Sequence, residues 1–364
     1  MTTMISTIDD PSAPHPKRGS RLAAWARLLL GTPLNAGLTA LFAVILIWSV
    51  PGLVRWAVLD AAFSPQNPEA CRTATGACWG FVAAKSGQIL FGIYPPAERW
   101  RPLLVCVIIL VLLVASVWPR LWGRRLVLAW AAALALVILL MLGGTFGLAS
   151  VPTSSWGGLP VTLILTVVAI GIAFPLSIAL ALARRSRMPA VRLLSTVAIE
   201  TIRGLPLLSL LFVASIMLPL FLPDSLLPDK FVRALVALTV FAAAYLAEVV
   251  RGGLQAIPKG QYEAAEALGL SYWQRQRLII LPQALRIVIP ALANTIIVMI
   301  KNTSLVLVVG LFDLISSGKA ALADPDWPSP AAETFLFIGA IYFALAFGFA
   351  RFADFLERRA KVAH

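Results

Sequence analysis

Eight long apolar segments run through this sequence, and they decide which solvent the chain can fold in. Each has about 20 residues, the length at which a helix crosses the hydrocarbon core of a bilayer. A soluble core cannot absorb them, since 60% of the 364 residues are apolar and 13% are charged, whereas soluble domains carry roughly 25% charged residues. We therefore predict an all-α integral membrane protein with about eight transmembrane helices, at residues 34–54, 103–117, 126–148, 160–183, 205–222, 231–250, 287–311 and 334–350.

Basic residues lie in short clusters between these segments and indicate how the chain is oriented. The net charge is +13, which in a soluble protein would suggest nucleic-acid binding. Here the arginines and lysines follow alternate apolar segments, as they do in cytoplasmic loops. We therefore expect both termini in the cytoplasm and no nucleic-acid partner. Loop 59–101 mixes acids and bases, but long loops cross a membrane largely regardless of charge, so we place it in the periplasm.

The apolar segments fall into two groups separated by a turn-rich linker at residues 150–155. Residues 1–33 form a cytoplasmic N-terminal segment, and no small-residue cleavage pattern closes the apolar segment that follows, so it is read as a retained helix. Residues 34–150 form an N-terminal extension of three helices. Residues 157–358 form a second part with five helices and a cytoplasmic hairpin at 261–282.

A mostly polar stretch between the sixth and seventh apolar segments carries the most distinctive pattern of the chain. Residues 261–268 are rich in helix formers, and Gly269 follows where a left-handed C-cap is needed. Ser271 and Gln274 match a capping box that starts a second short helix, and Pro282 is suited to the first turn of the next one. The pattern predicts a compact helix–turn–helix, carried by Glu263, Ala264, Ala265, Gly269, Ile279, Leu281 and Pro282.

This hairpin resembles the signature loop of the membrane subunits of ABC importers, which docks on a separate ATPase. Residues 247–305, with Ala247-Glu248-Val249-Val250-Arg251-Gly252-Gly253 and Ile300-Lys301-Asn302-Thr303-Ser304-Leu305, resemble the permeases of polar amino-acid ABC importers. Residues 199–208 are similar as well, although that family usually has Thr, Ser or a similar residue where this chain has Leu205. Including Ala77-Cys78-Trp79 and residues 98–102 of the extension, the chain resembles the permeases of general L-amino-acid importers of Gram-negative bacteria.

The resemblance implies a type I importer permease core preceded by three extra helices, in the bacterial inner membrane. It implies a second permease subunit, a cytoplasmic ABC ATPase dimer, a periplasmic amino-acid-binding protein and an L-amino acid substrate. The seven hairpin residues would couple to the ATPase, with the charges of Glu263 and Glu266 and the small Ala264 and Ala265 facing it. The chain has no phosphate-binding Gly-rich loop of its own, since Gly318-Lys319-Ala320 lacks the motif, so ATP belongs to the partner ATPase and no cofactor to this chain.

Ionisable and polar residues inside the spans are costly and are therefore candidates for function. Glu248 lies one turn before Arg251 and either forms a structural ion pair with it or contacts substrate. Glu200 and Arg203 precede the fifth span and form a local pair, a cytoplasmic gate or a contact with the ATPase. The set Lys301, Asn302, Thr303 and Ser304 interrupts the seventh span, which would bend or break there and either line the pathway or cap a helix at the interface. Glu333 is expected at the outer interface, where a charge costs little.

The cysteines and histidines suggest no metal site and no catalytic centre. Cys71 and Cys78 share the loop expected in the periplasm, where a disulfide is plausible, a free pair being the alternative. His15 and His364 lie near the termini, far from any cluster of acids, so a membrane enzyme is disfavoured. An ion-coupled secondary transporter would need acids in mid-span and repeated halves. This chain has few of either, so that class of transporter is disfavoured. Within the importer class, an opine, a metal chelate or a sulfur compound remains an alternative cargo.

Overall fold

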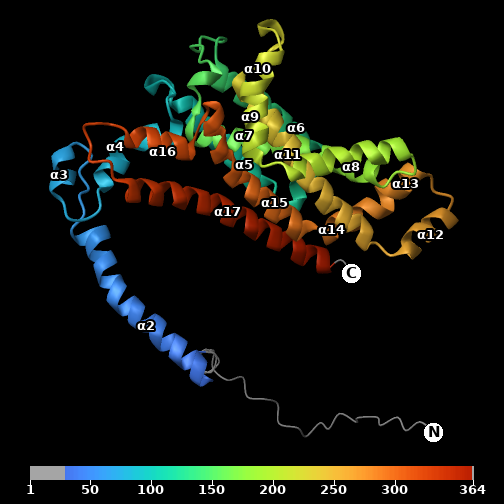
Figure 1. The fold of residues 1–364 in the computed structure, drawn as a ribbon, viewed down its shortest axis with the longest axis horizontal. Helices are drawn as coiled ribbons and strands as arrows, with labels where there is room; N and C mark the ends of the chain where they lie inside the picture. The colour runs from blue at the N-terminus through green and yellow to red at the C-terminus, as the bar shows by residue number, and fades with distance from the viewer. Residues whose placement is uncertain (1–28, 363–364) are drawn as a thin grey trace. The chain divides into compact units, whose positions relative to one another are not determined.

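The computed structural model describes residues 29–362, which are almost entirely helical (Figure 1). They form two compact units, one made of residues 29–61 and 74–77 and the other of residues 62–73 and 78–362. Most of the N-terminal segment expected at residues 1–33, and the two termini themselves, lie outside the described residues. The smaller unit contains helix α2 (Pro33–Val54) and the π-helical turn η1 (Arg55–Leu59).

The larger unit contains all the other elements. In chain order they are α3 (Pro68–Thr73), α4 (Trp79–Phe91), η2 (Pro96–Glu98), α5 (Trp100–Ala115), η3 (Pro119–Leu121), α6 (Arg124–Leu142), η4 (Thr153–Ser155), α7 (Gly158–Arg184), α8 (Pro189–Gly204), α9 (Leu207–Phe212), η5 (Val213–Met217), α10 (Leu218–Phe221), η6 (Asp224–Leu226), α11 (Lys230–Ala256), α12 (Lys259–Ala267), α13 (Tyr272–Arg275), η7 (Gln276–Ile280), α14 (Leu281–Ile287), α15 (Ile289–Asn302), η8 (Thr303–Val309), β1 (Phe312–Asp313), α16 (Leu314–Leu322) and α17 (Ala331–Val362).

Helix α2 of the smaller unit is apolar along its whole length, with a mean hydropathy of 2.1 in its span. Thr32 caps its first turn, since the Thr32 hydroxyl accepts a hydrogen bond of 3.1 Å from the backbone N–H of Asn35. Pro33 follows at the first helical position, where no N–H is needed. The helix passes into the π-turn η1, and the span reaches Leu59 rather than residue 54.

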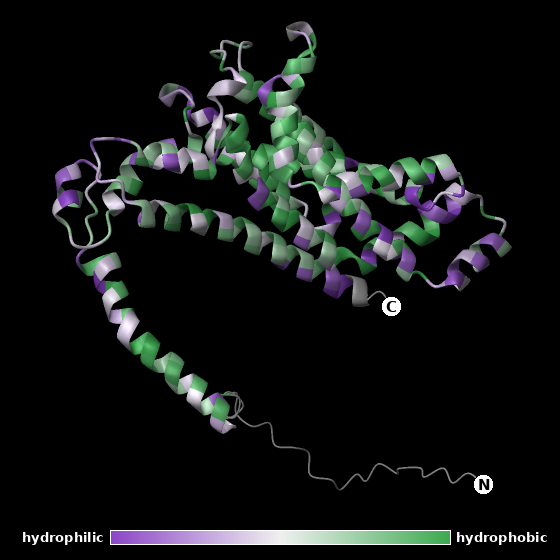
Figure 2. Cartoon of the chain, viewed as in Figure 1, coloured by the Kyte–Doolittle hydropathy of each residue, from purple (hydrophilic) through white to green (hydrophobic). Residues whose placement is uncertain are grey.

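Helices α7 and α11 form the core of the larger unit and pack along one another. Helix α11 buries a run of alanines that includes Ala234, Ala237, Ala242 and Ala243 in this core. Small side chains let two apolar helices approach closely, and this packing attracts helices in lipid, where burial from water contributes little. The same core takes in residues of α5 and α6, so two of the three helices expected in the extension pack with the second part. Figure 2 shows α7 and α11 mostly hydrophobic and α12 mostly hydrophilic.

Helices form at all eight expected segments, but not all of them are long. Within residues 29–362, six helices are long and apolar enough to cross a membrane, or up to seven if one bent pair counts as a single span. Helix α5 has only 16 residues. At the fifth expected span, the helix Leu207–Phe221 is bent by 103° from α8, which was not expected as a helix at all. Judged by length and hydropathy, the described residues therefore contain fewer spanning helices than the eight expected.

Two segments also end or continue differently from the prediction. Helix α6 ends at Leu142 rather than near residue 148, because Gly143 takes a positive φ of 64° and turns the chain. The expected break at residues 301–304 is wrong. The chain stays helical there and tightens from α15 into the 3₁₀ helix η8. The hydroxyls of Thr303 and Ser304 donate to Ile300 and Lys301 carbonyls of the same helix, at 2.7 and 2.8 Å, so they support the helix instead of opening it.

A buried arginine holds the end of α6. Arg101, at the start of α5, is fully buried, and its Nε and Nη1 donate to the carbonyl oxygens of Leu140 and Ala149 at 2.6 and 2.8 Å. The Tyr94 hydroxyl donates to the Met141 carbonyl at 3.1 Å. The last carbonyls of a helix lack partners and carry partial negative charge, so a cation and a hydroxyl are suitable caps. The sequence analysis did not identify this role.

Candidate functional site

The polar hairpin folds as its sequence predicted. Its first arm is α12, and Gly269 turns the chain with a φ of 70°. The N–H of Leu270 donates to the Ala265 carbonyl at 3.2 Å and that of Gly269 to the Glu266 carbonyl at 2.9 Å, which satisfies the end of the helix. An L-residue with a Cβ would be strained at this φ. The predicted left-handed cap is confirmed.

The second arm begins at the predicted capping box. The Ser271 hydroxyl accepts from the Gln274 N–H, and the Gln274 side chain accepts from the Ser271 N–H at 2.9 Å. Helix α13 then runs through the π-turn η7 into α14, where Pro282 occupies the first turn. A π-turn contains one extra residue per turn and rotates the following side chains. As a result Ile280 and Ala284 both point into a small core shared with Ala181, Val250 and Leu254 of α7 and α11.

The seven residues proposed for coupling differ in exposure. The exposed ones are Glu263, Ala264, Gly269 and Pro282, and the half-buried ones are Ile279 and Leu281. Ala265 has 0% of its surface exposed, so the prediction that it faces a partner is wrong. Helix α12 packs against η7, and Ala265 lies one turn after the half-buried Tyr262, on the same side of the helix. Its small side chain serves the packing of the hairpin itself.

One arginine links the two arms of the hairpin. Arg275 forms an ion pair with Glu266, and its guanidinium lies 5.8 Å from the ring centres of both Tyr262 and Tyr272. Stacked aromatic rings and a carboxylate suit the flat guanidinium group. Glu266 was expected to offer its charge to a partner, but here it is paired within the chain. Glu263 is exposed too, and it forms no ion pair within residues 29–362.

Five charged residues form a cluster near the C-terminal ends of α7, α8 and α11. Arg251 Nε donates to both carboxylate oxygens of Glu248, at 2.9 and 3.0 Å. Arg184 Nη1 donates to Glu248 at 2.9 Å, and its Nη2 to Glu200 at 2.7 Å. Arg203 lies 3.8 Å from both glutamates. The predicted pairs Glu248–Arg251 and Glu200–Arg203 are therefore parts of one network.

Arg184 is the member of this network that sequence reasoning missed. It was counted only as one of the basic residues after the fourth span, because the pairing joins residues far apart in the chain. Three guanidinium groups surround Glu248, whose side chain is 21% exposed, and Glu200 offsets part of their charge. The cluster therefore joins three helices by charge, and we call its five residues the brace.

The polar residues of the seventh span are not gathered into one site. Thr303 is buried beside Tyr342, whose hydroxyl donates to Asp313 at 3.1 Å. Lys301 is exposed and Asn302 and Ser304 are half-buried. The large cavity next to the hairpin is lined by none of these residues, nor by Glu248. The structure thus does not gather the predicted pathway residues around this cavity.

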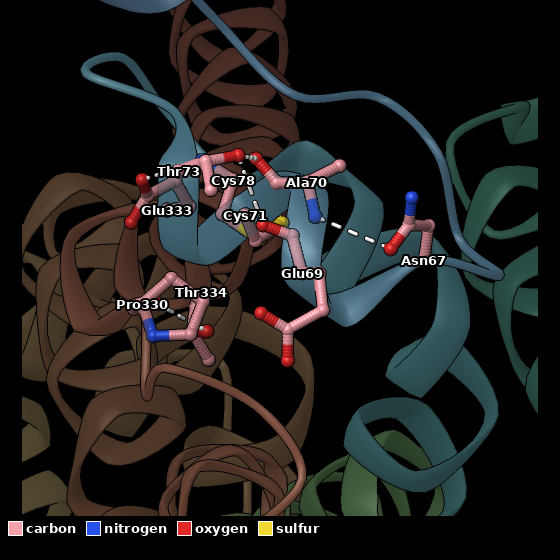
Figure 3. Close-up of a disulfide and its surroundings, with 9 residues drawn as sticks. All are labelled: Asn67, Glu69, Ala70, Cys71, Thr73, Cys78, Pro330, Glu333 and Thr334. Carbon is pink, nitrogen blue, oxygen red and sulfur yellow. Dashed lines mark hydrogen bonds between the residues drawn. A yellow bond between two sulfur atoms is a disulfide. The ribbon is translucent and has the colours of Figure 1, made fainter.

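Cys71 and Cys78 are joined by a disulfide with a Cα–Cα distance of 5.2 Å (Figure 3). The backbone N–H of Cys78 donates to the Glu333 carboxylate at 2.8 Å. Glu333 is buried within this chain, with 6% of its surface exposed. It lies in the first turn of α17, where the helix N-terminus favours a negative charge. The disulfide loop is thereby attached to α17.

Comparison with known proteins identifies the family. A family profile described as "Binding-protein-dependent transport system inner membrane component" matches residues 171–362. The chain belongs to this family. It is therefore a multi-pass membrane subunit of an ABC transport system and not an enzyme, as the sequence predicted. Membership also implies a binding protein and an ATPase as partners.

Similar proteins match along nearly the whole chain. The inner membrane amino-acid ABC transporter permease protein YhdY of Escherichia coli strain K12 is 46% identical over 355 residues, covering 97% of this chain and 96% of that protein. The glutamate/glutamine/aspartate/asparagine transport system permease protein BztC of Rhodobacter capsulatus is 36% identical, covering 97% of each. A solved structure titled "Crystal structure of an amino acid ABC transporter with histidines" is 34% identical over 54% of this chain and 90% of that one, with a TM-score of 0.49.

Proposed function

We propose that this chain is one of two permease subunits of an ABC importer for L-amino acids. A periplasmic binding protein delivers the amino acid, and a separate cytoplasmic ATPase dimer drives its passage through the membrane. The amino-acid cargo is supported by the permeases of E. coli and R. capsulatus that match this chain along nearly its whole length. Another small polar cargo, such as an opine or a sulfur compound, is the alternative that transport measurements would reveal.

The hairpin is the observation that carries the coupling role. Its tip presents Glu263, Ala264, Leu268 and Gly269 to the outside, and Leu268 is 75% exposed although it is apolar. Trp273 of the second arm is 70% exposed, so the hairpin carries apolar side chains on its surface, as protein interaction sites do. The opposite side of the hairpin is anchored by Ile280 and Ala284. We infer that Glu263, Ala264, Gly269, Ile279, Leu281 and Pro282 form or support the ATPase contact, while Ala265 packs inside.

Movement of the hairpin has a direct route to the spans. Ile280 and Ala284 pack against α7 and α11, and α14 also packs against α11. Within a few residues of that contact, the cluster of Glu248 and Arg184 ties α7 to α11 and α8. Close-packed, charge-linked helices move together rather than deform one by one. Closure of the ATPase dimer would therefore displace the inner halves of three helices.

The remaining assignments follow from the charge pattern and from the family. Both termini and the hairpin lie in the cytoplasm, where arginine-rich loops are retained, and residues 34–150 form an extension to a core at 157–358. We assign the pathway to the faces that carry Lys301, Asn302 and Ser304, in contact with the second permease, and keep Glu248 and Thr303 as further candidates. Glu200, Arg203 and Arg251 belong to the brace.

Uptake of labelled glutamate, glutamine and leucine tests this proposal in cells that carry the chain with its partner subunits. The variant Gly269→Asp introduces a strained, charged residue at the hairpin tip. Gly123→Asp is the matched control, because Gly123 also has a positive φ of 133° and, like Gly269, open space around it. We expect wild type and Gly123→Asp to take up amino acids and Gly269→Asp to lose most uptake, at equal amounts of chain in the membrane.

The outcomes separate the two parts of the proposal. Full uptake by Gly269→Asp would overturn the coupling role of the hairpin tip. Absence of uptake for every amino acid in wild type, while the binding protein still stimulates ATP hydrolysis by the reconstituted complex, would overturn the cargo and leave the coupling role in place.

A further inference from the structure

A cavity of about 1070 Å³ lies between the inner half of α7, the start of α8 and the hairpin. Its α7 and α8 walls are apolar and include Ile178, Leu182, Met188 and Val191. Of the residues assigned to the coupling role, Leu281 alone lines this space, and the residues of the hairpin tip lie outside its lining. None of the charged residues of the brace lines the cavity either.

The rim of the cavity is strongly basic. Arg185 and Arg187 line it from the end of α7, Arg275 and Arg277 from the hairpin, and Glu266 is the one acid among the lining residues. The cavity therefore carries three more positive than negative charges, and part of this excess faces walls of low polarity. An isolated cationic rim of this kind attracts an anion more strongly than the same charges in open water.

Buried polar atoms at the hairpin side of the cavity lack partners. The Nε of Arg275 and the Oε1 of Gln276 are both buried without a hydrogen bond in the described structure. Gln276 is 6% exposed and lines the cavity. Unsatisfied buried groups are rare in folded proteins because each one costs free energy. The Arg275 Nε is a donor and the Gln276 Oε1 an acceptor, so an ordered water is the partner that suits both atoms.

The order of these features along α7 matches one class of ligand. Apolar residues of the span come first, and the arginines follow where α7 ends at Arg184. Trp273, which is 70% exposed, and Tyr272 line the cavity from the hairpin together with Arg275 and Arg277, and such aromatic residues favour the membrane–water interface. A free phosphate or nucleotide would leave the apolar walls uncovered, whereas a phospholipid has an anionic head and apolar tails in this order.

We propose that this cavity binds an anionic phospholipid. The headgroup phosphate lies between Arg185 and Arg187 on one side and Arg275 and Arg277 on the other, and the acyl chains cover Ile178, Leu182 and Met188. The lipid then supports the hairpin from the membrane side and holds it against α7. This inference depends on the membrane location of the chain and not on its cargo.

Lipid retention measures the proposal directly. The purified transport complex is placed in lipid discs of phosphatidylethanolamine with or without phosphatidylglycerol, and retained lipid is counted by native mass spectrometry. The test variant is Arg185→Gln/Arg187→Gln, since both side chains are exposed and outside the brace and the hairpin tip. Arg192→Gln is the matched control, an exposed arginine of the nearby α8 that does not line the cavity.

We expect wild type and Arg192→Gln to retain phosphatidylglycerol equally, and the double variant to bind it about tenfold or more weakly, at about 1 kcal/mol for each basic residue near an anionic surface. Ala179→Trp, which places a bulky ring in the apolar wall, should also release the lipid without any change of charge.

Competition by inorganic phosphate alone would show a simple anion site and overturn the lipid assignment. Equal retention by all variants would overturn it too, with the partner ATPase or second permease then filling the cavity. Because retention is read without transport, these outcomes are independent of the proposed cargo.

Discussion

Arg184 and Glu248 join helices α7 and α11 through a hydrogen bond of 2.9 Å. The same guanidinium reaches Glu200 on α8 at 2.7 Å, so one side chain connects three helices. A planar group with several donors can satisfy two carboxylates at once, which lysine cannot do with the same geometry. The hairpin rests on two of these three helices, so the pair lies on the route by which hairpin movement would reach the spans.

Removing the charge of Glu248 should destabilise this region more than removing that of Glu200. Glu248→Gln leaves three arginines facing one another around a half-buried amide, and we expect a loss of about 1–3 kcal/mol. Glu200→Gln, at a side chain 51% exposed, should cost less than about 1 kcal/mol. Thermal unfolding of the detergent-solubilised complex measures both. Equal midpoints for the two variants would contradict the central position of Glu248 in the network.

The disulfide should stabilise the loop that packs against α16 and α17. Cys71→Ser/Cys78→Ser opens a loop closed across seven residues of separation, for which chain entropy predicts a loss of about 2–3 kcal/mol. The edge-to-face contact of Phe81 with Trp327, centred 5.6 Å apart, should loosen with it and change the tryptophan emission.

Thiol labelling of the native and the denatured chain checks the pairing. We expect Cys71 and Cys78 to react only after reduction. Cys106, which is free and buried, serves as an internal control and should react only after denaturation. Labelling of Cys71 without reductant in freshly isolated membranes would rule the disulfide out.

The buried Arg101 should be essential for the end of α6. Arg101→Met keeps much of the side-chain volume but removes the donors to Leu140 and Ala149, leaving helix-end carbonyls unpaired, and we expect a loss of about 2–4 kcal/mol. Tyr94→Phe removes one hydrogen bond, to Met141, and should cost about 1 kcal/mol. The amount of intact chain in the membrane and its thermal midpoint report both effects. A Tyr94→Phe loss as large as that of Arg101→Met would contradict this ranking.

The pair of Lys85 and Asp324 should make the attachment of loop 323–330 sensitive to acid. The hydrogen bond from the Lys85 ammonium holds the pKa of Asp324 below its ordinary value, helped by the backbone N–H of Asp326. A lowered carboxylate pKa contributes stability that is present above the unfolded-state pKa of about 3.9 and is lost as the pH falls through the folded-state pKa. The stability that this ion pair contributes to the wild-type protein should therefore be lost below about pH 4.

The variant Asp324→Asn isolates this contribution. Its thermal midpoint should lie below that of wild type near pH 7, and the difference should shrink toward zero in acid. Asp326→Asn, whose carboxylate forms no ion pair within residues 29–362, should follow the wild-type curve. A constant difference between wild type and Asp324→Asn across this pH range would contradict the assignment.

Local patterns were sufficient to predict the hairpin. Gly269, Ser271 and Gln274 are neighbours in the chain, and a left-handed turn and a capping box depend only on residues three or four positions apart, so their conformation could be read in advance. The long spans were equally predictable where hydropathy alone decides, as in α7 and α11. The prediction failed at Thr303 and Ser304, because their hydroxyls are compatible with two structures. One is an interrupted helix, and the other is a continuous helix in which the hydroxyls donate to its own carbonyl oxygens.

The sequence by itself determined that this chain spans a membrane, which loop forms the hairpin and which family the chain resembles. Segment length, hydropathy and short-range residue spacing carry that information. Only the tertiary structure decided that Arg184 joins Glu248 and Glu200, that Arg101 caps α6, that Ala265 is buried, and that a basic cavity lies behind the hairpin. Each of these features depends on which faces of two helices pack together. That packing brings together residues tens of positions apart, and no short-range pattern in the sequence indicates it.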